Sequence, residues 1–182
     1  LIMMTDESIK ALFTQSIQTQ ISAVESLSED MLATVELLVG HLLNGQRVFI
    51  SGTDTSSSLA GHFVHLMTEG MKLERPPFPV ISLTSSPKKQ LAALGQSGDI
   101  LLVIADRDSD QLTGVMESAI SREMIIIALT SEGNELVSGL LGPNDVELRV
   151  PSLNAARVLE TQLFILHSLC EQIESTIFPE EH

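Results

Sequence analysis

Residues 47–58 have the sequence Arg-Val-Phe-Ile-Ser-Gly-Thr-Asp-Thr-Ser-Ser-Ser. The apolar run at residues 48–50 is short and continuous, which is typical of a strand covered on both faces. The loop that follows, residues 52–58, is rich in small hydroxyl side chains and leads into a helical pattern. A buried strand, a turn of this kind and a helix form the repeating unit of a parallel α/β sheet.

The rest of the chain repeats this unit. Four more apolar runs of strand length stand at residues 79–83, 100–105, 124–130 and 146–150, and helical patterns stand at residues 56–71, 87–94, 111–122, 135–141 and 155–175. This alternation predicts an α/β fold with five parallel strands and helices on both faces of the sheet.

Two amphipathic segments precede the first strand. The first covers residues 6–25, and the second begins at Ser28 and stops near Asn44-Gly45, so we expect an N-terminal helical hairpin. The expected organisation is one domain, 1–182, with N-terminal helices in 1–45, an α/β core in 46–152 and a C-terminal helix and tail in 153–182.

Charge and cysteine content exclude several classes of function. The 24 acidic residues against 10 basic ones give a formal net charge of −14, which disfavours direct binding to nucleic acid or to an anionic membrane. No apolar run approaches the ~20 residues of a membrane span, and we find no basic secretory leader. Cys170 is the single cysteine and has no partner for an internal disulfide, so a cytoplasmic location is expected.

Two loops are candidate ligand sites, because ligands of such sheets bind beyond the carboxyl ends of the strands. In the first loop, the hydroxyl groups and the following helix N-terminus could hold a phosphate; the alternative is that Thr55 or Ser56 merely caps that helix. The candidate ligand-binding residues are Thr53, Thr55, Ser56, Ser57 and Ser109.

The second loop argues against a phosphate ligand. Asp106, Asp108 and Asp110 stand within five residues, and like charges ~4 Å apart repel by about 4 kcal/mol at an effective dielectric constant near 20. A calcium loop is not favoured either, because Gln111 stands where glycine is required. We expect Asp108 or Asp110 to cap the helix that follows.

The chain resembles the sugar isomerase (SIS) family, and within it the phosphoheptose isomerase branch and the non-catalytic DnaA initiator-associating branch. The segments that carry the resemblance are 13–21, 74–76, 98–102, 140–143, 145–152 and 177–179. The resemblance spans nearly the whole chain and implies a flavodoxin-like SIS domain and a homotetramer.

The resemblance also shows where catalytic residues are missing. The isomerase branch uses a His and a Glu four residues apart on one helix, with a Gln and a His eight apart on the last helix, to bind a metal and move protons. His62 and His167 match the two histidines, whereas Leu66 and Leu159 stand at the Glu and Gln positions. A leucine cannot accept a proton, so we expect no isomerase activity, a mere remnant of a metal site and no cofactor, zinc included. A rearranged site that recruits His65 and Glu69 is the alternative.

The remaining expectation concerns partner proteins. Ile177 and Phe178 are expected just beyond the last helix, either as an exposed anchor for a partner or folded back on their own core. The resemblance implies a homotetrameric scaffold or regulator that binds a partner protein, with DnaA as the candidate. The alternatives are a protein that binds or senses a sugar phosphate and a divergent phosphoheptose isomerase.

Overall fold

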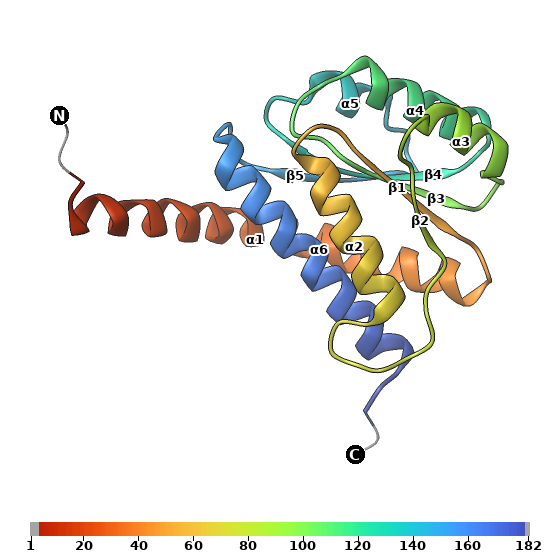
Figure 1. Cartoon of the computed structure of the whole chain (residues 1–182), viewed down its shortest axis with the longest axis horizontal. Helices are drawn as coiled ribbons and strands as arrows, with labels where there is room; N and C mark the ends of the chain where they lie inside the picture. Colours follow the sequence, from red (N-terminus) through yellow and green to blue (C-terminus); the bar gives the residue numbers. More distant parts are fainter. Residues whose placement is uncertain (1–3, 181–182) are drawn as a thin grey trace.

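The computed structural model describes residues 4–180, which fold around one five-stranded, all-parallel sheet (Figure 1). The strands are β1 (Val48–Gly52), β2 (Val80–Ser82), β3 (Ile100–Ile104), β4 (Ile125–Ser131) and β5 (Val146–Val150). Their order across the sheet is β2-β1-β3-β4-β5, which confirms the flavodoxin-like arrangement. The carboxyl ends of β1 and β3 are therefore neighbours, with Gly52 paired to Ile104.

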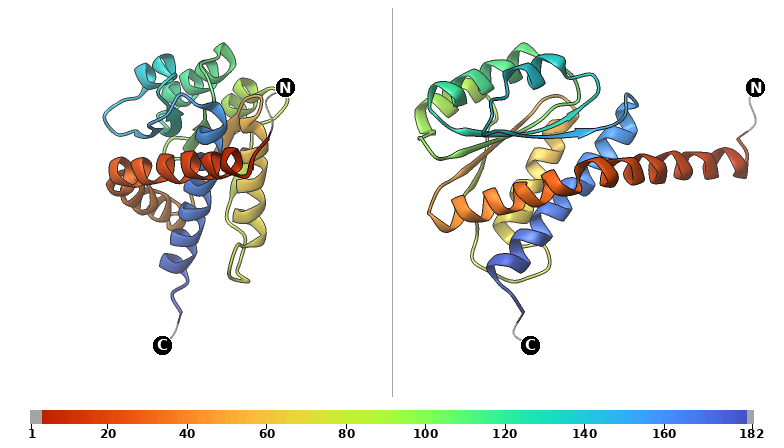
Figure 2. Two further views of the ribbon diagram at one scale, coloured as in Figure 1. Left: turned by 90° about the vertical axis from the view of Figure 1, so that its left-hand side faces the viewer. Right: turned by 180° about the vertical axis from the view of Figure 1, so that it is seen from behind.

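Two layers of helices cover the sheet (Figures 1 and 2). On one face lie α1 (Asp6–Leu43), α2 (Ser56–Glu69) and α6 (Ala155–Ile177), and on the other lie α3 (Pro87–Leu94), α4 (Asp110–Ser121) and α5 (Glu135–Leu140). Side chains of β1 alternate between the layers, because Val48 and Ile50 pack with the first group and Phe49 with the second. The central strands β1, β3 and β4 are thus buried on both sides, as their apolar sequences predict, whereas the edge strands β2 and β5 are only partly buried.

The N-terminal hairpin predicted from the sequence is wrong. Residues 6–43 form one continuous helix, α1, which a capping box at Thr5 starts. The expected break fails because neither glycine nor proline stands between the two segments, and the Ser26 hydroxyl bonds back to Ser22 and Ala23 inside the helix. Ser28 therefore lies within a helix instead of starting one.

Helix α1 packs on the domain only along its second half. Its buried residues begin at Ala23, while the first half extends past the sheet into solvent (Figure 2). One of the contacts that hold this projecting half is the Ser16 hydroxyl, which donates to Glu160 of α6 at 2.8 Å. Within residues 4–180, no helix combines the length and apolar character that crossing a bilayer requires.

Candidate functional site

The two loops at the carboxyl ends of β1 and β3 are bridged by their own side chains. The Thr55 hydroxyl donates to Asp106 at 3.0 Å, and Arg107 forms an ion pair with Asp54. The hydrogen bond to Asp54 and the nearby carboxylates raise the pKa of Arg107, so this cation stays charged. The two loops that would have to receive a ligand are therefore joined to each other.

Besides Thr55, two more of the five candidate ligand-binding hydroxyls already form hydrogen bonds within their own loops. Ser57 donates to the carbonyl of Asp54 at 2.7 Å, and Ser109 caps α4 by accepting from the Leu112 amide. Thr53 and Ser56 are buried, and neither of their hydroxyl oxygens has a protein hydrogen-bond partner in residues 4–180. Two of the five predicted residues thus have an unpartnered hydroxyl, but both side chains are buried.

Neither Thr55 nor Ser56 caps α2 with its side chain. Thr55 stands at the N-cap position but makes no capping hydrogen bond, because its hydroxyl is turned toward Asp106.

The expected role of Asp108 and Asp110 as caps of α4 is also wrong. Ser109 takes that role, and Asp110 is the exposed first residue of α4. The carboxylate of Asp108 instead accepts hydrogen bonds from the amides of Leu136 and Val137, at 2.9 and 3.2 Å. Asp108 therefore caps α5, a helix that begins in the next unit of the fold.

His62 and His167 are brought together as the resemblance predicts. Their Nε2 atoms lie 2.8 Å apart, joining α2 to α6. Burial lowers the pKa of His62, and the neighbouring His167 and His65 lower it further. The neutral form of the His62 ring is thus favoured, and in the hydrogen bond between the two imidazoles one nitrogen donates and the other accepts.

The surroundings of this pair do not fit a zinc site. Leu66, one turn after His62, and Leu159, about two turns before His167, are half-buried and pack against the apolar core. No group of three or more His, Cys, Asp or Glu side chains within residues 4–180 is placed to hold a metal ion. His65 and Glu69 are exposed on α2 and do not complete one.

Ile177 does not lie beyond the last helix, as the sequence suggested, but is the final residue of α6. It is half-buried against the core, and Phe178 follows as the half-buried C-cap residue. The ring of Phe178 lies 6.2 Å from that of Phe78, between centroids. Both side chains therefore combine a packed inner side with a surface that solvent still reaches.

A buried ion pair supports this end of the molecule, and the sequence analysis did not anticipate it. The side chains of Arg75 and Glu174 are 1% and 2% exposed and meet at 3.0 Å. Burial alone raises the pKa of Glu174, but hydrogen bonds from the Met71 and Lys72 amides and from Arg75 lower it overall. Arg75 also donates to the last carbonyls of α2 and lies 4.1 Å from the centroid of the Phe78 ring.

Cys170 is buried beside this pair, and burial raises the pKa of its thiol to about 11. The thiol is therefore protonated at neutral pH and unsuited to nucleophilic chemistry.

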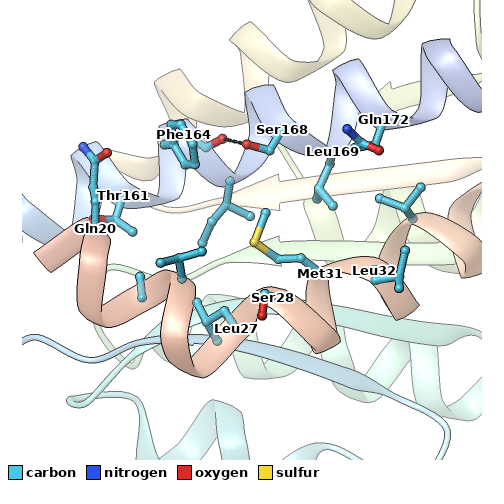
Figure 3. Close-up of a pocket in the computed structure, with 14 residues that line it drawn as sticks. Gln20, Leu27, Ser28, Met31, Leu32, Thr161, Phe164, Ser168, Leu169 and Gln172 are labelled. Carbon is cyan, nitrogen blue, oxygen red and sulfur yellow. Dashed lines mark hydrogen bonds between the residues drawn. The ribbon is translucent and has the colours of Figure 1, made fainter.

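An apolar groove runs between α1 and α6, and we call it the α1–α6 groove (Figure 3). It encloses about 280 Å³, and its walls include Leu27, Met31, Phe164 and Leu169. The projecting half of α1 continues this apolar surface. Its exposed large apolar residues are Ile9, Leu12, Phe13, Ile17, Ile21 and Val24. So long an uncovered stripe is typical of an interaction surface.

Comparison with known proteins finds relatives that match nearly the whole chain. A phosphoheptose isomerase of Pseudoalteromonas atlantica is 39% identical over 96% of this chain and 97% of its own length. The DnaA initiator-associating protein DiaA of Escherichia coli is 40% identical over 96% of this chain and 98% of its own. No family model matches the sequence.

The structural comparison agrees with the sequence comparison. A phosphoheptose isomerase from Francisella tularensis superposes with a TM-score of 0.86 at 32% identity, covering 95% of this chain and all of that one. The same enzyme from Neisseria gonorrhoeae superposes with a TM-score of 0.85 at 28% identity, over 93% of this chain and 98% of that one.

Proposed function

Because the chain belongs to the SIS-domain family of the phosphoheptose isomerases and the DnaA initiator-associating proteins, we propose that it is a non-catalytic member that binds a partner protein, DnaA, as a homotetramer. The proposal separates two activities that proteins of this family are named for. The side chains around the histidine pair support the non-catalytic role.

One observation carries the non-catalytic part of the proposal. His62 and His167 share a hydrogen bond with each other. Leu66 and Leu159 stand at the two positions where the isomerase branch has a carboxylate and an amide. Moving a proton between two carbons of a sugar needs a base within hydrogen-bond reach of that proton. Two apolar side chains packed into the core provide neither a base nor metal ligands.

The loops at the carboxyl ends of β1 and β3 support the same conclusion. A phosphate dianion bound between them would meet the carboxylates of Asp54 and Asp106. The adjacent cation, Arg107, is already paired to Asp54. Thr55, which could donate to a phosphate, donates to Asp106 instead. These charges disfavour the alternative in which the chain binds or senses a sugar phosphate.

The surface at the end of α6 supports the partner-binding part. Ile177 and Phe178 are half-buried, so their conformations are restrained before a partner arrives. Aromatic side chains held in this way are the type that anchor protein interfaces, because little entropy is lost on binding. An acidic partner is disfavoured by the net charge of −14, and a basic one is attracted.

The homotetramer is supported by the apolar surface of α1. In the projecting half of this helix, Phe13 is 68% exposed and Ile17 is 56% exposed, and the α1–α6 groove is a further uncovered apolar surface. A second copy of the chain would cover both features at once, since each copy carries the stripe and the groove. Four copies would present four Phe178 anchors, and linked sites raise avidity by ~100-fold or more.

The proposal is tested by measuring two activities of one purified preparation. Isomerisation of sedoheptulose 7-phosphate, followed by NMR with and without added zinc, should not exceed the rate in buffer. Purified DnaA from the same organism should bind in a titration, with a light-scattering mass of four chains for the unbound protein. Turnover of the sugar phosphate, or no binding of DnaA, would contradict the proposal.

A further inference from the structure

A second groove lies at the C-terminal end of α6, on the surface that carries Phe178. It encloses about 390 Å³ between the start of the connection from α2 to β2 and the last turn of α6. Leu73, from the connection, and Phe178 and Pro179, from the other side, form its apolar walls. We call it the C-terminal groove; it is separate from the α1–α6 groove, with which it shares no residue.

Hydrogen bonds hold the start of the connection from α2 to β2 against α6 at this groove. Glu174, on its floor, accepts hydrogen bonds from the Met71 and Lys72 amides at 2.7 and 3.1 Å and pairs with Arg75. Gly70 has φ of +99°, and a Cβ atom there would lie 2.3 Å from the Leu73 carbonyl oxygen. These contacts fix the backbone that presents Leu73, so the apolar wall is formed before any partner binds.

The rim of the groove is acidic on balance. Lys72 at the rim is already paired to Glu171 at 3.0 Å, and Glu180 stands exposed on the opposite side. An apolar cleft with a carboxylate at its edge suits a segment that carries one large apolar side chain beside a Lys or Arg. The net charge of the whole chain, −14, acts in the same direction.

We propose that the C-terminal groove binds an apolar side chain from a basic segment of the partner protein. Leu73 and Phe178 would contact this side chain from the two walls of the groove. The inference rests on the proposed function and adds Leu73 and Glu180 to the binding surface. Leu73 lies more than a hundred residues before Phe178, so the surface is composed of two distant parts of the chain.

The test measures the affinity of purified DnaA for the full-length protein and for two variants. Leu73→Ala removes one wall and should raise Kd about tenfold or more, as loss of a central interface contact does. Glu180→Lys should slow association and weaken its dependence on ionic strength. Leu136→Ala, at a leucine of α5 that is 59% exposed, and Glu117→Lys, at an exposed glutamate of α4, are the matched controls.

The outcomes separate this inference from the proposed function. If the unmodified protein binds DnaA and both groove variants bind it as the controls do, the groove is not the docking site, although the proposed function stands. If the unmodified protein does not bind DnaA, the proposed function and the inference both fail. The melting temperature of Leu73→Ala shows whether that variant is still folded. Glu180 is exposed, so Glu180→Lys tests the groove without the risk of unfolding the protein.

Discussion

The Nε2 atoms of His62 and His167 lie 2.8 Å apart, so two histidines from facing helices bond to each other. Leu66 and Leu159 occupy the neighbouring positions that would supply a carboxylate and an amide. The pair is thus a contact between α2 and α6, and its contribution can be measured as a change in the stability of the protein.

The histidine pair should make stability fall in mild acid. Because the pKa of His62 is lowered from 6.5 in the folded state, the unfolded chain binds a proton more readily. The stabilising contribution is thus complete above pH 6.5 and is lost as the pH falls below it, when His167 and His65 repel the new charge. Thermal unfolding between about pH 7.5 and pH 5.5 should show a smaller decline in Tm for His62→Gln. An equal decline in both proteins would count against this role.

Restoring the two missing polar groups should create a zinc site. The double variant Leu66→Glu, Leu159→Gln would offer two imidazoles, a carboxylate and an amide, which is a four-ligand set. Without zinc, this variant should be less stable than the native chain, because a carboxylate replaces a packed leucine. Zinc should raise its Tm and leave that of the native chain unchanged. A similar zinc response in the native chain would show that Leu66 and Leu159 are not the decisive change.

Breaking the buried ion pair should cost far more than breaking one at the surface. Arg75→Met leaves Glu174 buried and uncompensated and should lower the free energy of unfolding by about 3–5 kcal/mol. The double variant Arg75→Met, Glu174→Leu should recover part of that loss. Lys10→Ala, which removes an exposed pair with Asp6, should cost no more than about 1 kcal/mol. Urea unfolding measures all four proteins, and equal losses at both sites would refute the structural role.

The apolar stripe of α1 should control assembly. Phe13→Asp places a charge at a site that is 68% exposed in the single chain, so the isolated fold should be unaffected. Light scattering should give a mass below four chains for this variant and an unchanged circular dichroism spectrum. Leu136→Asp, a comparable change on α5, should keep the native mass. A native mass for Phe13→Asp would move the subunit contact away from α1.

Much of the fold follows from local sequence pattern. β1 and β3 are buried on both faces by the two helix layers, and their continuous apolar runs locate them to within about two residues. The hairpin prediction failed at Ser28, because a serine that can cap a helix can equally bond within one. The packing of residues 23–38 on α6 favours one continuous helix over a helix that starts at Ser28.

The candidate site was less predictable, because its key contacts join distant residues. Arg75 and Glu174 are 99 residues apart, and neither has a pattern around it that indicates a buried pair. Asp108 caps α5 across 28 residues, although its position just before α4 suggested a local role. Periodicity placed Phe13 and Ile17 on the apolar face of a helix, but only the structure shows that face uncovered.

Binding of a partner through the surface that carries Phe178 is tested most directly by a titration. Purified DnaA should bind the native protein, and Phe178→Ala should weaken that binding about tenfold or more while keeping the native mass and a native circular dichroism spectrum. Leu94→Ala, at an exposed leucine of α3, should bind as the native protein does. Equal affinity of DnaA for the native protein and for Phe178→Ala would contradict the claim.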